Sequence, residues 1–489
     1  MYRTKSLYTT AGFQVQQNLH WEMLTDDQCE AVLVRALELL ERTGFEAKSD
    51  AACKIFADAG CRVEGGRVRI PSAKSEWALR VAPSRVTLCD REGNRAMVLE
   101  TNHVHYGPGF ACKQILDANA EAPRDFTIAD VEKVGMLVDS LPGIDFAMSG
   151  GVPTDVPAKT AEVHAFKALL ETTVKPIVQN VKCMNQAKAV YDLAVAAVGS
   201  EDKLRWDPCV VLHVAADESL LISGEALDIV AFAAEKGIPV VFSNELIAGH
   251  TAPSESAGVL IVALANSIAA LVLSQAVAEG APFITGGFFG SCDVDNQMVP
   301  YGAPEVSLLG AGYAGVLRYL RIPSFGFAAA TDSKMSDAQL GLESAMSTLT
   351  AGLAGTNLIH GAGTVESGCA FSLMLLTLAD ELAAITRRIM RGVEMDEDRL
   401  ARGVIDEVEP GGHYLGTLHT RYYFKSEQFW PTLMNRKRID DWAAEGSLSL
   451  GDRTVNKTED LLNSYQKAAI LADGSKEFAA IVDKVDAAG

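Results

Sequence analysis

The residues of this chain with the clearest chemical potential are aromatic, acidic and basic side chains that stand at the ends of short apolar runs. Ring faces attract quaternary and other large cations, and nearby carboxylates strengthen that attraction. The candidates for such a cation site are the rings of Tyr106, Phe288, Phe289 and Phe327 and the carboxylates of Glu245, Asp332 and Glu366. Lys334 and His360 complete the set, because either side chain could bind an anionic group of the same ligand.

Each candidate also has a purely structural interpretation. Aromatic residues at strand ends commonly pack in a core, and His213 could be a core histidine with its hydrogen bonds satisfied. Gln179 and Asn180 could line the interior of a barrel, and Lys334 could pair with Asp332. The pair favoured as functional is His360 with Glu366, because a histidine inside the last strand, beside a glycine-rich exit, points into the mouth of a barrel.

Metal and phosphate sites are not indicated. The chain has no H-E-x-x-H motif, His103 and His105 stand apart from other ligands, and none of the nine cysteines has C-x-x-C spacing. Gly361 and Gly363 could form a phosphate nest, but the matching glycine-rich turn after the preceding strand is missing.

Charge and composition narrow the class of protein. The net charge of −20 over 489 residues argues against nucleic acid or an anionic membrane as the main partner. Unpaired, scattered cysteines suit a reducing compartment, and residues 1–14 lack the pattern of a signal peptide. A cytoplasmic protein is expected.

One uncharged stretch, 256–278, is long enough to cross a membrane. Polar residues interrupt it, and its ends lack aromatic or basic anchors, so a buried helix at a subunit interface is predicted instead. The large apolar surface of such a helix predicts a homo-oligomer.

The elements that would position the candidate residues follow two patterns. Residues 1–100 predict a mixed α+β cap, with a helix that opens on a capping box at Thr25 and Gln28 and with hairpins over 61–70 and 85–99. From there to residue 392, apolar runs alternate with helical patterns. The expected strands are 103–109, 145–151, 175–181, 209–215, 239–245, 282–289, 323–330 and 356–363. The expected helices are 127–140, 158–172, 186–198, 224–236, 256–278, 305–320, 337–354 and 373–391.

Eight apolar strands, each followed by a helix, predict an α/β fold, a (β/α)8 TIM barrel over residues 101–392. A doubly wound sheet is the alternative, but its G-x-G-x-x-G motif is absent after the first strand. Residues 393–489 predict a C-terminal helical extension that packs back on the barrel. The active site is expected at the carboxyl ends of the strands, where the candidate residues lie, with Asn244 beside Glu245.

Three stretches of the chain resemble the trimethylamine methyltransferase family. They are FGFAAATDSKMSDAQLGLESA (325–345), NLIHGAGTVESG (357–368) and HYLGTLHTRYYFKSEQFWP (413–431). The resemblance implies a (β/α)8 enzyme that transfers a methyl group from a methylated amine to the cobalt of a separate corrinoid protein. No tightly bound cofactor is then expected in this chain.

The founding members of that family carry pyrrolysine, whereas this sequence shows only standard residues and is similar to the non-pyrrolysine branch. That branch implies a quaternary substrate such as glycine betaine, with trimethylamine less favoured. Two alternatives stay open: a Schiff-base lyase or aldolase that uses Lys334, and a non-catalytic betaine-binding homologue.

Overall fold

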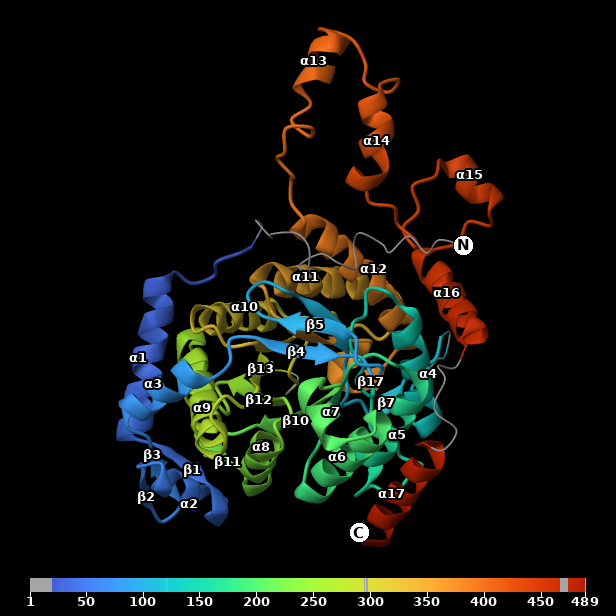
Figure 1. The fold of residues 1–489 in the computed structure, drawn as a ribbon. Helices are drawn as coiled ribbons and strands as arrows, with labels where there is room; N and C mark the ends of the chain where they lie inside the picture. The colour runs from blue at the N-terminus through green and yellow to red at the C-terminus, as the bar shows by residue number, and fades with distance from the viewer. Residues whose placement is uncertain are drawn as a thin grey trace.

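The protein is a closed barrel of parallel strands surrounded by helices (Figure 1). The computed structural model describes residues 20–118, 120, 122–293, 295, 298–466 and 474–488, so the prediction about residues 1–14 lies outside the described residues. Seven strands form one parallel sheet in the order β6-β15-β14-β13-β12-β10-β9. They are β6 (His105–Pro108), β9 (Ile177–Asn180), β10 (Val210–Ala216), β12 (Val240–Ala248), β13 (Phe283–Ser291), β14 (Ser324–Phe327) and β15 (Leu358–Ala362).

A short eighth segment, 145–150, closes the sheet into a barrel between β6 and β9. Ala147 pairs in parallel with Ile177 of β9. On the other side, the amide of Asp145 donates to the carbonyl of Tyr106 at 2.7 Å, and the amide of Gly150 donates to the carbonyl of Gly109 at 2.9 Å. The predicted TIM barrel and its eight strand positions are therefore confirmed.

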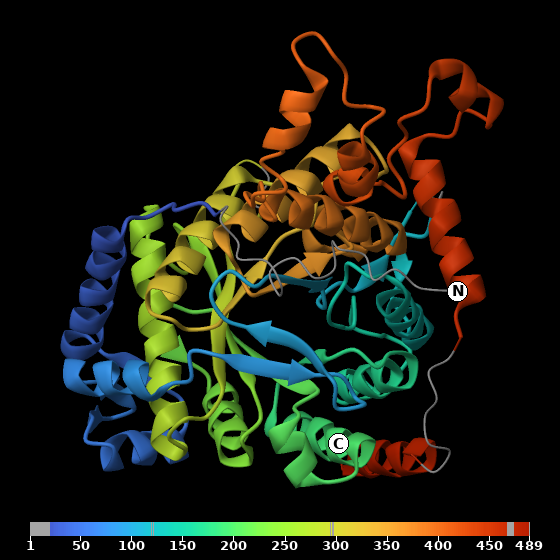
Figure 2. The ribbon, with the colours of Figure 1, turned by 45° about the horizontal axis from the view of Figure 1, so that its top comes forward.

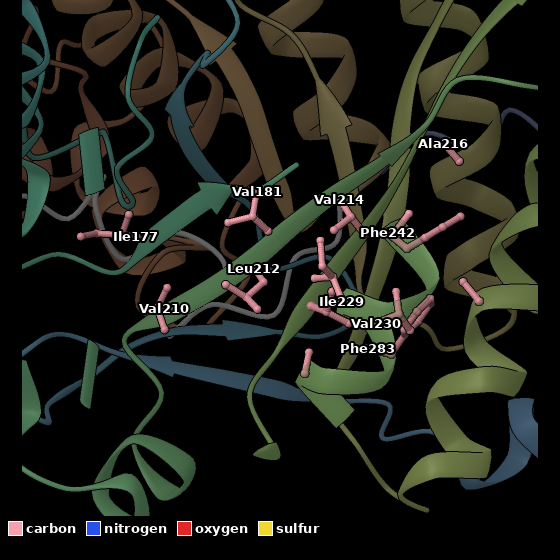
Figure 3. Close-up of a cluster of buried hydrophobic side chains, with 14 of the residues drawn as sticks. Ile177, Val181, Val210, Leu212, Val214, Ala216, Ile229, Val230, Phe242 and Phe283 are labelled. Carbon is pink, nitrogen blue, oxygen red and sulfur yellow. The ribbon is translucent and has the colours of Figure 1, made fainter. Parts of the chain in front are cut away.

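Each barrel strand is followed by a helix, as the sequence pattern predicts. These helices are α4 (Ile128–Ser140), α5 (Ala161–Thr172), α6 (Met184–Val198), α8 (Gly224–Lys236), α9 (Ser256–Val277), α10 (Pro304–Tyr319), α11 (Ala338–Ala354) and α12 (Leu373–Met390), with the short α7 (Glu201–Trp206) before β10. Outward-facing strand residues such as Val210, Leu212 and Phe242 pack with Ile229 and Val230 of α8 (Figure 3). Inward-facing residues form a separate cluster inside the barrel.

The N-terminal elements cover one side of the barrel and close its amino-terminal end. They are α1 (Asp26–Arg42), β1 (Phe45–Ala47), α2 (Asp50–Asp58), β2 (Arg62–Glu64), β3 (Arg67–Arg69), α3 (Ser72–Val81), β4 (Val86–Cys89) and β5 (Arg95–Leu99). The Thr25–Gln28 capping box and both predicted hairpins are present. Leu88 and Met97 of the β4–β5 hairpin pack against barrel-interior residues, so the hairpin plugs that end.

Helix α9 is buried inside the subunit. It is long and apolar enough to pass a length-and-composition test for a membrane span, but most of its residues are covered by α1, α2, α3 and α8. The predicted buried helix is confirmed. Its proposed place at a subunit interface is wrong, because the N-terminal helices of the same chain cover it, and the argument for an oligomer from this surface falls with it.

The C-terminal residues follow two courses. Helices α16 (Leu450–Ser464) and α17 (Gly474–Ala488) pack back on α12 and α4 and on α6 and α5, respectively. Helices α13 (Arg402–Val408), α14 (Leu418–Glu427) and α15 (Ile439–Ala444) project away from the barrel (Figures 1 and 2). Helices α16 and α17 thus lie on the barrel, whereas α13, α14 and α15 stand out from it.

A buried ion pair holds the closing segment of the barrel. The guanidinium of Arg387 in α12 is fully buried, donates to the Gly143 carbonyl at 3.0 Å and pairs with the Asp145 carboxylate. The same carboxylate accepts the Tyr106 amide at 2.8 Å. One carboxylate thus joins a helix to two neighbouring strands.

We predict that Arg387→Leu lowers the free energy of unfolding by about 3–5 kcal/mol, because it leaves the Asp145 carboxylate mostly buried and unpaired. Urea unfolding followed by circular dichroism measures the change. Arg67→Leu, at an exposed arginine, is the matched control and is expected to stay within about 0.5 kcal/mol of the parent. Adding Asp145→Asn to Arg387→Leu should recover part of the loss; a single variant as stable as the parent would contradict the role given to this pair.

Candidate active site

Three aromatic rings meet at the carboxyl end of the barrel. Phe288 comes from β13 and Phe327 from β14, and Tyr301 lies on the connection from β13 to α10. The ring centroids are 4.6 Å apart for Phe288 and Tyr301, 5.1 Å for Phe288 and Phe327, and 5.1 Å for Tyr301 and Phe327. We refer to these three residues as the aromatic box.

The rings of the aromatic box contact one another directly. A trimethylammonium group is about 6 Å across, and each ring that binds it stands within about 6 Å of the nitrogen. Centroids at 4.6 to 5.1 Å leave no such space between the rings. Phe288 and Phe327 are on barrel strands, whereas Tyr301 is on a connection, so Tyr301 is the ring that can give way to a ligand.

Asp332 positions the segment that carries Tyr301. Its carboxylate accepts the amides of Tyr301 at 2.7 Å and Gly302 at 3.0 Å, and the hydroxyl of Ser367 at 2.8 Å. Loops from three consecutive strands are thereby tied together over the mouth. Gly368, at φ +87°, lies below the Tyr301 ring, and a Cβ there would stand 2.6 Å from the phenol oxygen.

Glu245 supplies a carboxyl group next to the aromatic box. It follows Asn244 on β12, pairs in register with Phe288 and accepts the Ser243 hydroxyl at 2.6 Å. Burial raises the pKa of Glu245 to about 7, with a smaller contribution from Asp217. Burial first, and the charge of Glu245 second, raise the pKa of the Tyr301 phenol. The carboxyl can thus be neutral without a ligand and ionised beside a cation.

A second group of rings lies deeper in the barrel. His360 of β15 stacks on Phe325 of β14 with centroids 4.3 Å apart, and its ring centroid is 5.2 Å from that of Phe327. Phe110 covers both His360 and His213, at 5.6 and 4.8 Å. Among the described residues, neither ring nitrogen of the buried His360 has a hydrogen-bond partner. Such unpaired buried nitrogens mark a place where a polar ligand group can bind.

The protonation of the two histidines follows from their surroundings. Burial lowers the pKa of His213 to about 3 and, together with the neighbouring His213, lowers the pKa of His360 well below its ordinary value. His213 Nδ1 lies 3.1 Å from the Asn180 side-chain oxygen, which can only accept, so Nδ1 carries the proton and Nε2 has none.

A chain of polar contacts fixes that tautomer. The Asn180 amide group donates to Glu162 at 3.2 Å, and the Gln179 side chain donates to the Glu162 carbonyl at 3.1 Å. The ammonium of Lys182, at the surface, pairs with Glu162 at 2.9 Å. Asn180 therefore orients His213 and does more than line a layer of the barrel. Gln179 holds the first turn of α5 through Glu162.

Two of the predicted cage residues face away from the mouth. Successive strand residues point to opposite faces, and Gly107 and Phe288 take the inward positions. Tyr106 therefore points outward, where its hydroxyl donates to the Thr348 carbonyl and its ring lies 5.2 Å from the Arg387 guanidinium. Phe289 packs edge to face against Tyr313 of α10, with ring centroids 5.1 Å apart. Both are packing residues, and their predicted place in a cage is wrong.

The remaining predicted residues separate by position. Phe288, Phe327, Glu245 and His360 come together at the mouth, as expected. The Asp332 oxygens are occupied by the protein's own donors, so Asp332 positions the loop and is no charge partner. Lys334 is exposed, and its ammonium donates to the Asp332 carbonyl at 2.7 Å, away from the rings. Glu366 is half-buried at the rim, two residues before Gly368.

The glycines after His360 serve close packing. Gly361 has φ +114°, and a Cβ there would lie 2.7 Å from the Phe327 ring; Gly363, at φ +92°, would meet the Phe371 ring at 2.4 Å. Aromatic rings thus occupy the space that a phosphate would need, so these glycines do not form a phosphate nest. Among the described residues, no group of three His, Cys, Asp or Glu side chains could hold a metal ion.

Tyr301 and Phe110 are absent from the sequence-based candidates. Both lie on connections outside the predicted strands, where periodicity gives no direction for a side chain. Tyr301 follows Pro300, and its position three residues before α10 carries no motif. Only the three-dimensional loop geometry set by Asp332 brings it to the box.

Known proteins with similar sequences are methyltransferases that act on methylated amines. A family model described as trimethylamine methyltransferase (MTTB) matches residues 3–489. The chain is 30% identical over 492 residues to the trimethylamine methyltransferase MttB of Methanosarcina barkeri, with 98% of each protein covered. It is 28% identical over 454 residues to the glycine betaine methyltransferase of Desulfitobacterium hafniense (strain Y51), with 92% of this chain and 94% of that protein covered.

A solved structure shares the fold. The crystal structure of the Methanosarcina barkeri monomethylamine methyltransferase (MtmB) matches with a TM-score of 0.52 at 12% identity, over 95% of this chain and 93% of that chain. At this identity the match bears on the fold alone, and it agrees with the barrel described above.

We predict that Glu245→Gln changes how stability depends on pH. A raised pKa means that the folded state binds the Glu245 proton more tightly than the unfolded state does, so the parent loses stability as pH rises from about 4.5 to about 7. The glutamine variant lacks that loss. Its free energy of unfolding should gain on the order of 2 kcal/mol over the parent between pH 5 and pH 8, a value discounted for partial solvent screening.

Urea unfolding at the two pH values measures this difference. Glu30→Gln, at an exposed position on α1, is the control and is expected to run parallel to the parent. A constant difference between the Glu245→Gln variant and the parent would show that Glu245 does not titrate in this range.

Proposed function

The chain belongs to the trimethylamine methyltransferase (MTTB) family, and from that membership and the site geometry we propose that it demethylates a betaine. The donor is a quaternary amine that carries a carboxylate, with glycine betaine the favoured substrate. The acceptor is the reduced cobalt of a corrinoid held by a separate protein. The aromatic box beside Glu245 and the unpaired His360 is the observation that carries the proposal.

The proposed reaction needs no general acid from this chain. A quaternary nitrogen leaves as a neutral tertiary amine when it loses a methyl group, so the leaving amine needs no proton. The corrinoid of the partner, when docked, supplies the nucleophile that takes the methyl carbon. This chain binds the cation, turns one methyl toward the open mouth and excludes water. The half-buried Tyr301 and Glu366 stand at that open end.

The cation would bind where Tyr301 now lies. When the Tyr301 ring moves aside, the faces of Phe288 and Phe327 become available to the methyl groups, and Glu245 lies next to Phe288 in register. A bound positive charge favours the ionised form of Glu245, so binding releases the proton that burial retains. The trimethylammonium group is thereby held by rings and by one new negative charge.

The carboxylate of the betaine would bind His360. The His360 ring lies 5.2 Å from Phe327, a separation that suits the short spacer of glycine betaine better than that of a longer betaine. The neutral imidazole offers one N–H donor, which has no partner in the part of the chain that the structure describes. Trimethylamine has no group to satisfy that donor, which is why a betaine is preferred over trimethylamine.

The two alternative functions have less support. Lys334, the Schiff-base candidate, is exposed and turned onto its own loop. A binding protein without activity would need the cation site but no open path from the substrate methyl group to a docked corrinoid. The site lies at the barrel mouth, where such a path is open, and this favours the enzyme. We further propose that the enzyme works in the cytoplasm, uses no pyrrolysine and binds no cofactor of its own tightly.

The first test is methyl transfer. Purified protein is incubated anaerobically with cob(I)alamin, and the absorbance change on methylation is followed with glycine betaine, proline betaine, carnitine, γ-butyrobetaine and trimethylamine. We expect methylation with glycine betaine and little with trimethylamine. If no amine reacts, the panel is repeated with candidate corrinoid proteins. Silence there from a folded protein that still binds betaine would favour the non-catalytic homologue.

His360→Phe tests the carboxylate assignment. Loss of a hydrogen bond to a charged group costs about 1.5–3 kcal/mol, so kcat/KM for glycine betaine should fall by about 10- to 100-fold. Tetramethylammonium has the cation but no carboxylate, and its rate should change by less than about threefold. An equal loss for both compounds would mean that His360 shapes the barrel and does not bind the carboxylate.

A further inference from the structure

The segment that projects from the barrel carries an unusual amount of exposed apolar surface. We call residues 393–430, which include α13 and α14, the arm (Figures 1 and 2). Of the 22 exposed large apolar side chains among the described residues, ten lie in the arm. They are Val393, Met395, Leu400, Ile405, Tyr414, Leu415, Leu418, Tyr422, Phe424 and Trp430. Exposed patches of this kind commonly mark a protein interface.

The arm is firmly rooted and is not a loose tail. Arg388 of α12 donates to the Glu427 carbonyl at 2.7 Å, and Arg391 donates to the Ser426 carbonyl at 2.7 Å. Both arginines also pair with the Glu427 carboxylate, at 3.6 and 3.7 Å. The end of α14 is thus fixed to the end of α12, and the arm is held out from the barrel in a defined place.

That root lies away from the barrel mouth. Helix α12 follows the last strand and runs back along the barrel, so its carboxyl end, where the arm begins, is at the amino-terminal end of the barrel. The site for the methyl donor is at the opposite end. A corrinoid protein that docks over the mouth would not need to touch the arm, so the arm is available to another partner.

The two arm helices present faces of opposite charge. On α13 the spacing i, i+3, i+4 places Arg402, Ile405 and Asp406 on one face, and Glu409 follows directly after the helix, so the acids there outnumber the bases by one. On α14 the spacing i, i+3, i+4, i+7 places Leu418, Arg421, Tyr422 and Lys425 on one face. Leu418 and Tyr422 are 81% and 79% exposed, so this face is uncovered within the subunit.

The charge balance of the whole arm agrees with these faces. Residues 393–410 contain seven acidic residues and two arginines. In residues 413–430 the single acidic residue, Glu427, is already paired with Arg388, Arg391 and Arg399. Arg421 and Lys425 remain exposed there. An acidic apolar face and a basic apolar face on one arm are complementary to each other only across two molecules, since both are exposed within one.

We infer that the arm is an assembly element that binds a second copy of this chain. The α13 face of one subunit packs on the α14 face of the other, and a twofold axis repeats the contact. Ile405 of each subunit then lies against Leu418 and Tyr422 of the other, with acids opposite bases. Such a self-complementary contact closes on itself and does not produce filaments.

The test uses charge reversal in two variants. The first carries Asp406→Lys and Glu409→Lys, and the second carries Arg421→Glu and Lys425→Glu. Sedimentation should show the parent as a dimer or a larger even assembly. Like charges then face each other in each variant alone, so its dissociation constant should rise by about tenfold or more. Mixed in equal amounts, the two variants should associate again, because every contact is then complementary.

Trp206→Ser, which removes an exposed apolar side chain far from the arm, is the control and should leave the mass unchanged. Crosslinking gives a second measurement: Ile405→Cys protein mixed with tagged Leu418→Cys protein, both in a background with the exposed Cys292 and Cys369 changed to Ser, should form a mixed product with a short bismaleimide, and the background protein alone should not. A monomeric parent at all concentrations, a mixture that fails to reassociate, or the absence of the mixed product would overturn the inference. Methyl transfer to free cob(I)alamin is measured separately, so failure of this inference and of the proposed function are distinguishable.

Discussion

The Asp145 carboxylate stands where the barrel has to close. A barrel needs every strand paired on both sides, and the segment that fills the gap between β6 and β9, 145–150, is too short and irregular for a full ladder with β9. The Asp145 carboxylate supplies part of what the ladder lacks, because it accepts the Tyr106 amide from one strand and pairs with Arg387 from α12. The directions of all inward-facing side chains depend on that closure, since an open sheet would not converge them on one mouth.

Because the inward-facing side chains of all strands meet inside one closed barrel, neutral and apolar groups dominate the site. The interior below the mouth is filled by apolar side chains and sealed by the β4–β5 hairpin, so His213 and His360 are held in surroundings that keep them uncharged. Glu245 stands one layer higher, with Ser243 as its hydrogen-bond donor, and keeps a carboxyl group that can still ionise. The chain thus supplies an ionisable carboxyl group at the level of the aromatic box and only uncharged histidines below it.

The sequence predicts the fold well because its information is periodic. Apolar runs followed by amphipathic helices suffice for eight strands and eight helices, and the same period of two puts Phe288 inside and Phe289 outside once the inward register is known. The sequence alone could not choose between the two phenylalanines, because both are apolar and adjacent. Tyr106 was wrongly placed in the cage for the same reason. Helix α9 was wrongly placed at a subunit interface because the N-terminal helices that cover it lie some 200 residues away in the chain.

What the sequence could not predict lies in the loops. Tyr301 reaches the aromatic box because Asp332, from the next loop, accepts its amide, and because Gly368, from the loop after that, leaves room for its ring. No local pattern encodes an arrangement that three separate connections build together. The same arrangement explains how a closed site can accept a ligand. The contacts with Asp332 hold the Tyr301 backbone, whereas its side chain is held by packing against the rings of Phe288 and Phe327. A rotation of that side chain opens the box without disturbing the strands, so the barrel can stay rigid while the mouth changes.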